Sequence, residues 1–207
     1  MSKGMKIFLG IMAVLVILVI GAYASIKGTY NSLVSLDEGV NGAWSQVQNV
    51  YQRRADLIPN LVQTVKGYAA HEKETLEAVI QARASATRPQ INAREVLQNP
   101  QLFRQFEQAQ GQLTSALGRL MVVIERYPDL KANTNFIRLQ DELAGTENRI
   151  AVERRRFNES VQGYNQTVRS FPTMIFAGVF GFQQRQYFEA SPEAQQAPEV
   201  DFSTNNN

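Results

Sequence analysis

The sequence predicts an all-α protein in which one N-terminal transmembrane helix precedes an antiparallel four-helix bundle. Three observations support this fold class. An uncharged apolar stretch lies near the N-terminus, apolar residues then recur alternately three and four positions apart, and prolines or capping residues stand at the expected helix ends. We expect a membrane anchor over residues 1–27, a helical bundle over 28–182 and a largely disordered tail over 183–207.

The apolar stretch has the length of a membrane span. Lys6 and Lys27 enclose 20 residues without a charge, and residues 7–24 are all apolar or glycine. At about 1.5 Å per helical residue this stretch measures roughly 30 Å, the thickness of a bilayer's hydrocarbon core. A signal peptide cleaved after Ala24 is the alternative, because residues 22–24 resemble an A-x-A cleavage site. The stretch exceeds the roughly 7–15 apolar residues of a signal peptide, which favours a retained anchor.

The charges indicate how the chain is oriented and which partners it lacks. Three of the 21 basic residues are Lys3, Lys6 and Lys27, which leaves 18 basic residues against 19 acidic ones in the bundle and tail. A domain with this balance lacks the basic surface typical of nucleic-acid binding. Lys3 and Lys6 place the N-terminus in the cytoplasm and the bundle outside it by the positive-inside rule, whereas Lys27 alone favours the opposite orientation.

The first half of the bundle region contains one long apolar stripe, over residues 33–68. We expect a helix break near residues 55–56, because Pro59 is tolerated in the first turn of a helix and Asp56 can cap a helix that starts after it. The second helix would then end at about residue 86. A kinked but continuous helix through Pro59 is the alternative.

Two further helices follow in the second half. Asn99-Pro100 reads as a cap with proline at the first helical position, and Tyr127-Pro128 ends this third helix. Asn133 or Thr134 can cap the fourth helix, which Phe171-Pro172 closes. Four amphipathic helices joined by short polar connectors predict an up-and-down bundle.

Charged residues interrupt the apolar stripes at three positions: Arg54 on the first helix, and Glu147 and Arg154 on the fourth. An unpaired buried charge is heavily penalised, so these side chains should pair with one another or reach solvent. The expected pair is Arg54 with Glu147. We interpret the three residues as a structural polar layer that sets helix register, with a ligand or proton site as the alternative.

The residues after Phe171-Pro172 are apolar but too few to span a bilayer. Soluble domains rarely expose such a patch, so the segment should close one end of the bundle, lie in the membrane interface or contact another subunit. Because the last helix of an antiparallel bundle ends near the anchor, we expect one of the latter two. The predicted interaction segment comprises Met174, Ile175, Phe176, Val179, Phe180 and Phe182.

The sequence predicts no catalytic, cofactor-binding or metal-ligating residues. His71-Glu72 begins like a zinc-protease motif, but the second histidine that this motif needs is replaced by Thr75. The chain has one histidine and no cysteine, which leaves no usual zinc ligand set and no thiol nucleophile. We therefore expect no enzyme activity and no bound cofactor.

Several sequence blocks resemble the LemA family, and the most specific is the block Arg53–Leu61 within Tyr51–Val62. The other blocks are Tyr30–Val34, Ala43-Trp44, Val65–Tyr68, His71-Glu72, Tyr127–Ala132, Phe136, Glu147-Asn148, Tyr164-Asn165 and Phe171-Pro172. The resemblance implies a bacterial protein with a single N-terminal membrane helix and a four-helix bundle. A relative in magnetosome-forming bacteria is implicated in making those membrane compartments. The resemblance carries over no catalytic or binding residues.

Two functions of different kinds follow as hypotheses. The first is a scaffold or adaptor in the bacterial cytoplasmic membrane, with the lipid bilayer, other proteins or further copies of the chain as partners. The second is an extracytoplasmic ligand sensor that uses the layer of Arg54, Glu147 and Arg154. The chain offers amphipathic surfaces and no reactive constellation, which favours the scaffold.

Overall fold

The computed structural model describes residues 3–88 and 93–189, and every regular element within these ranges is a helix. The elements are α1 (Lys3–Tyr68), α2 (Lys73–Ala86), α3 (Ala93–Gln98), α4 (Pro100–Ile124), α5 (Pro128–Lys131), α6 (Thr134–Arg169) and α7 (Thr173–Phe180). The predicted all-helical class with a long apolar N-terminal helix is confirmed.

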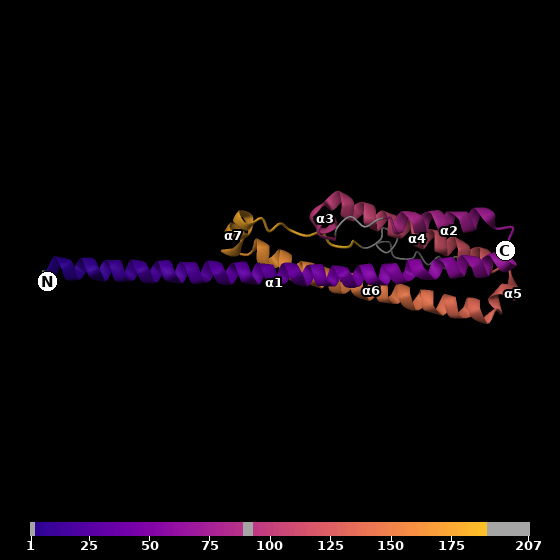
Figure 1. Ribbon diagram of the computed structural model, residues 1–207, viewed down its shortest axis with the longest axis horizontal. Helices are drawn as coiled ribbons and strands as arrows, with labels where there is room; N and C mark the ends of the chain where they lie inside the picture. Colours follow the sequence, from indigo (N-terminus) through magenta and orange to yellow (C-terminus); the bar gives the residue numbers. More distant parts are fainter. Residues whose placement is uncertain (1–2, 89–92, 190–207) are drawn as a thin grey trace, which may run out of the picture.

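α1 carries the apolar stretch and then continues into the packed part of the molecule (Figure 1). Residues 3–25 are all exposed, and the first buried residue of the helix is Leu33. By length and composition, the N-terminal part of α1 is a candidate membrane span. The apolar stretch and the first packed helix are therefore one element.

The predicted helix break near residues 55–56 is wrong, because α1 runs without interruption through Pro59. A proline inside a helix has no N–H to donate to the carbonyl four residues earlier, which here belongs to Ala55. The Arg83 side chain of α2 supplies the missing donor, with its Nε 2.7 Å from the Ala55 oxygen. Asp56 lies inside α1 and so is not at the helix start that the sequence predicts. Its carboxylate accepts a hydrogen bond from Gln52, one turn earlier in α1.

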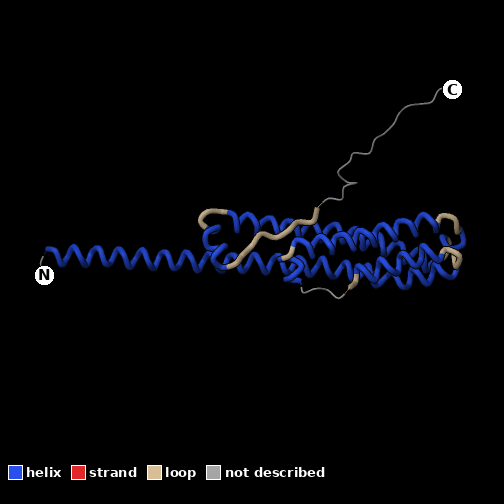
Figure 2. Tube along the Cα trace, turned by 90° about the horizontal axis from the view of Figure 1, so that it is seen from above, coloured by secondary structure: helices blue, strands red, loops and turns tan. Residues whose placement is uncertain are grey.

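The helices lie side by side (Figure 2) and alternate in direction, as the sequence colours of Figure 1 show. α1 leads away from the apolar stretch, α2 and α3 return, α4 leads away again and α6 returns along α1. Two of the predicted caps are confirmed at the starts of α4 and α6. Asn99 accepts hydrogen bonds from two backbone amides of the first turn of α4, and Asn133 accepts one from Phe136.

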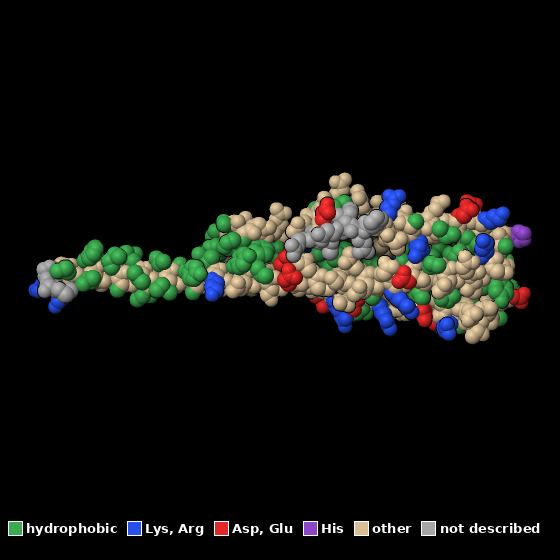
Figure 3. Space-filling model, viewed as in Figure 1, with side chains coloured by type: hydrophobic (Ala, Val, Ile, Leu, Met, Phe, Trp, Pro, Cys, Tyr) green, Lys and Arg blue, Asp and Glu red, His purple; other side chains and the backbone are tan. Residues whose placement is uncertain are grey.

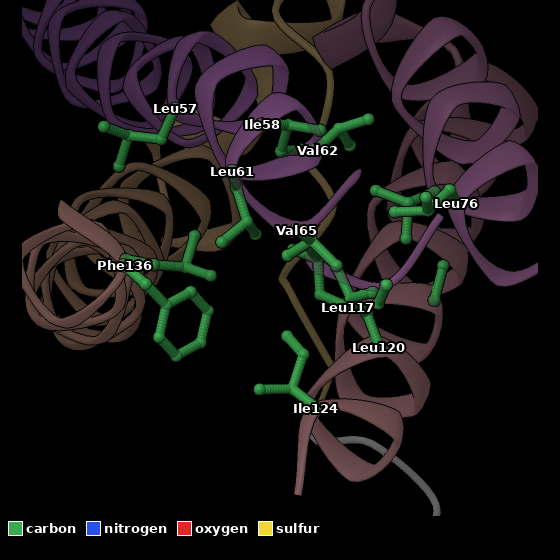
Figure 4. Packing of buried hydrophobic residues seen from close by; sticks show 14 of the residues in the cluster. Leu57, Ile58, Leu61, Val62, Val65, Leu76, Leu117, Leu120, Ile124 and Phe136 are labelled. Carbon is green, nitrogen blue, oxygen red and sulfur yellow. The ribbon is translucent and has the colours of Figure 1, made fainter. Parts of the chain in front are cut away.

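Two hydrophobic clusters fill the interior. The distal cluster joins α1, α2, α4 and α6 far from the apolar stretch, and Figure 4 shows Leu61, Leu120 and Phe136 among its members. The proximal cluster lies nearer the apolar stretch, and its centre is aromatic. In it Trp44 packs against Phe103 and Phe157 at ring-centroid distances of 5.7 and 5.5 Å.

The C-terminal segment of residues 183–189 differs from the expected disordered tail. It runs in extended form across the packed helices (Figure 2). Arg185 and Phe188 within it are buried, so this segment is part of the core and not a tail. The rest of the expected tail, residues 190–207, lies outside the described residues.

Candidate functional site: an apolar helix beside the N-terminal stretch and a buried polar layer

α7 lies beside α1 at the end of the packed helices that adjoins the apolar stretch (Figure 1). The Phe180 ring meets the Tyr30 ring edge to face at a centroid distance of 5.0 Å, and Phe182 approaches the same ring at 5.9 Å. Ala177 is the buried residue of α7. The segment therefore emerges near the apolar stretch, at the end of the packed helices where it is expected.

The predicted interaction segment divides into a packed part and an exposed part. Phe176 and Phe182 are half-buried, and Phe180 is exposed at the edge of its contact with Tyr30. By contrast, Met174 is 56% exposed, Ile175 54% and Val179 78%. In the view of Figure 3 the apolar surface of this end of the molecule adjoins that of the N-terminal helix.

Arg54 is buried at the centre of the molecule, with 1% of its side chain exposed. One terminal nitrogen, Nη1, donates to Glu147 Oε1 and to Thr114 Oγ1, both at 2.9 Å. The other, Nη2, donates to Gln110 Oε1 at 2.6 Å. Arg54 and Glu147 thus form the ion pair that the sequence predicts. The polar layer also contains the Thr114 and Gln110 side chains of α4.

This polar layer separates the two hydrophobic clusters. On α1, Tyr51 belongs to the proximal cluster and Leu57 to the distal one, with Arg54 between them. On α6, Leu143 and Ile150 flank Glu147 in the same way. A shift of α1 by one turn along α6 would therefore break the ion pair and bury its charges in an apolar layer.

The polar layer leaves little room for a ligand. The cavity beside Gln110 and Tyr51 has a volume of about 10 Å³, which holds at most one water molecule. Burial raises the pKa of Tyr51, and the opposing attraction of the nearby Arg154 and Arg54 does not cancel this effect. Tyr51 therefore stays neutral and packs against Arg54, whose guanidinium carbon lies 5.1 Å from the ring centre.

Arg154 forms its ion pair and its hydrogen bonds outside this layer, which differs from the expected grouping of three residues. Its guanidinium donates to the Glu189 backbone oxygen at 2.9 Å and lies 3.5 Å from Glu107 Oε1. It also covers the Phe188 ring, at 4.6 Å from the ring centre. Burial raises the pKa of Glu107 despite the attraction of Arg154. Arg154 therefore fastens the C-terminal segment onto α6 and α4.

A second buried arginine, Arg185, is absent from the prediction. Its Nη2 donates to Asp37 Oδ1 of α1 at 2.6 Å. Its backbone N–H donates to Asn165 Oδ1 at 2.8 Å, and Asn165 Nδ2 donates back to the Arg185 oxygen at 2.9 Å. Asn158 holds the backbone of Phe188 through the same pair of bonds, both 2.9 Å long. Two asparagines of α6 therefore replace the backbone partners that an extended segment lacks.

These contacts hold the helices and the C-terminal segment together. Across residues 3–88 and 93–189, no three His, Cys, Asp or Glu side chains come together as metal ligands would. His71 is exposed in the turn between α1 and α2. Its neighbour Glu72 accepts hydrogen bonds from Arg126 and Tyr127, both at 2.9 Å, and so joins this turn to the end of α4.

Comparison with known proteins identifies the family. A model of the LemA family matches residues 43–202, which is more than half of the chain. The chain belongs to the LemA family. Within this LemA-family chain, the matched region begins in α1 beyond the apolar stretch and includes α2 to α7.

Several relatives of this LemA-family protein are similar over most of its length. It is similar to the magnetosome protein MamQ of Magnetospirillum gryphiswaldense, at 27% identity over 87% of this chain and 72% of the relative. Magnetosome protein MamQ 2 of Paramagnetospirillum magneticum is 26% identical over 88% of this chain and 72% of its own. Protein LemA of Metamycoplasma hominis is 24% identical over 84% of this chain and 76% of the relative.

Proposed function

We propose that this LemA-family protein is a membrane-tethered scaffold that holds a helical body at a bacterial cytoplasmic membrane. In this proposal residues 1–27 are a retained anchor, and α1, α2, α4 and α6 of residues 28–182 act as an antiparallel four-helix bundle. The N-terminus lies in the cytoplasm and the bundle outside it, as Lys3 and Lys6 indicate.

The continuity of α1 is the observation that carries this proposal. One helix leads from the candidate membrane span to the distal turn, so the packed body cannot pivot freely on a linker. A catalytic domain needs a reactive site, whereas the buried arginines Arg54 and Arg185 of this body hold its helices and its C-terminal segment together. Three relatives are named magnetosome proteins, which fits a role in organising a membrane.

Photo-crosslinking in native membranes tests the scaffold. A photoreactive amino acid at Val122 of α4 or Ile137 of α6 would probe two exposed apolar positions of the body, and mass spectrometry would identify the adducts. We expect discrete adducts with specific membrane proteins or with further copies of the chain. A matched single-span protein of equal abundance and with the same label serves as the control. Adducts no different from those of this control would contradict the scaffold.

A further inference from the structure

α7 is apolar on both of its faces, and only one of them is packed. The packed face contains Ala177, Phe176 and Phe180. The other face follows a helical spacing of i, i+1, i+5 through Met174, Ile175 and Val179, which are all more than half exposed. Contiguous apolar surface of this kind marks a site of interaction in soluble proteins.

We propose that the exposed face of α7 inserts into the lipid–water boundary of the same membrane that α1 crosses. The partner is a lipid surface, and α7 is a second point of attachment beside the span. This inference rests on the proposed function only in requiring that the N-terminal part of α1 lies in a membrane.

The height of α7 along α1 supports this partner. α7 meets α1 at Tyr30, six residues beyond Ala24, where the apolar stretch ends. Six helical residues rise roughly 9 Å. Each headgroup region of a bilayer is roughly 5–8 Å thick, because the whole membrane measures about 40–45 Å around a hydrocarbon core of about 30 Å. α7 therefore meets α1 at the outer edge of the headgroups of a membrane crossed by residues 7–24, from which its exposed side chains reach into this boundary.

The charges around α7 fit a membrane surface as well. Residues 170–184 contain no charged side chain, so the segment can insert without burying a charge. Lys27 and Arg169 border it and are exposed, at positions from which a long cationic side chain can reach lipid phosphates. Tyr23 and Tyr30 add aromatic rings at the level where membrane proteins concentrate them.

Site-directed spin labelling of the full chain in vesicles of phosphatidylethanolamine and phosphatidylglycerol tests this inference. The chain has no cysteine, so a single cysteine introduces one label. Ile175→Cys and Val179→Cys place it on α7, Val14→Cys within the apolar stretch and Ile80→Cys on the exposed side of α2. The measured quantity is the ratio of the label's collision frequency with oxygen to its collision frequency with a water-soluble nickel complex. We expect this ratio to be at least threefold higher at positions 175 and 179 than at position 80.

The four labels separate the possible outcomes. Water-like collision ratios at 175 and 179, with Val14 in hydrocarbon, would overturn the inference and leave the anchor intact. A water-like ratio at 14 would overturn the anchor itself, and with it the proposed function. Spin–spin broadening at 175 and 179 that disappears on dilution with unlabelled chain would show that a second copy covers α7, and would also overturn the inference. The fluorescence of Trp44, the only tryptophan, checks that each variant is folded.

Discussion

Arg83 of α2 donates a hydrogen bond to the backbone oxygen of Ala55 in α1, across a distance of 2.7 Å. The Ala55 oxygen is the acceptor that Pro59 leaves without its helical donor. A side chain 28 residues further along the chain therefore repairs the helix and joins α2 to α1 at the same point.

Replacing Arg83 with methionine should destabilise the protein by about 1–3 kcal/mol, because it leaves the Ala55 oxygen without a partner. The loss should be much smaller in a Pro59→Ala background, where residue 59 regains an N–H that can donate to Ala55. Urea unfolding of the four proteins of this double-mutant cycle measures the coupling. Equal losses in the two backgrounds would show that Arg83 does not act through Pro59. Arg104→Met on exposed α4 surface is the control.

The neighbouring arginines Arg53 and Arg54 provide a matched pair. Arg54→Met should cost about 1.5–3 kcal/mol, because it leaves Gln110, Thr114 and the partly exposed Glu147 without their shared donor. Arg53→Met removes an ion pair with Glu142 whose side chains are 60% and 42% exposed, and it should cost about 0–1 kcal/mol. Thermal unfolding followed by circular dichroism compares the two. Similar losses would mean that the pair of the buried Arg54 contributes no more than the surface pair of Arg53.

The two asparagines of α6 should control the C-terminal segment. Asn165→Ala removes both hydrogen bonds that hold the Arg185 backbone, so the Arg185 amide should exchange with deuterium at least about tenfold faster. The distal helices should keep their protection. Hydrogen exchange monitored by NMR measures both regions. The control is Asn148→Ala, an exposed position of α6, and a similar acceleration there would contradict this role for Asn165.

Glu107 should favour the folded state less as the pH rises. Burial raises its pKa in the folded protein, so between the ordinary pKa of 4.5 and the raised pKa the folded state holds a proton that the unfolded state has lost. Stability from this group is therefore present below pH 4.5 and declines above it. The stability of Glu107→Gln relative to the natural protein should rise over this window, as urea unfolding at successive pH values measures. A difference that is constant with pH would contradict this expectation.

The N-terminal apolar stretch should remain in the mature protein, because it is longer than a signal peptide requires. N-terminal sequencing of protein from native membranes checks this directly, and a chain that starts at Ser25 would contradict it. Protease treatment of spheroplasts checks the orientation. Protection of the helical body in intact spheroplasts would show that it faces the cytoplasm.

Local patterns predict the helices and two of their caps, because each depends on residues a few positions apart. Asn99 and Asn133 could be identified as caps in this way. The continuity of α1 could not, because the donor that makes Pro59 tolerable comes from Arg83 in another helix. Local sequence around Pro59 favours a break, and a tertiary contact reverses the outcome.

In the candidate site too, the residues on regular apolar stripes could be predicted and a residue placed by tertiary contacts could not. Arg54 and Glu147 could be paired from the sequence because both interrupt regular apolar stripes. Arg185 could not, since it lies in an extended segment with no periodicity to interrupt. The signal available there was the aromatic pair Phe182 and Phe188 around Arg185 in a stretch that otherwise reads as polar. Arg154 sits on a stripe, yet it serves this segment instead of the polar layer.

With residues 7–24 as the proposed membrane span, the unbroken course of α1 couples the tilt of this span to the position of the distal turn. The 44 residues from Ala24 to Tyr68 measure roughly 66 Å, so a change of about 10° in the tilt of the span displaces the distal turn sideways by roughly 11 Å. Transmembrane helices change their tilt when the thickness of the bilayer changes. Thinner or thicker membrane would therefore alter the position of the distal turn, far from the lipid.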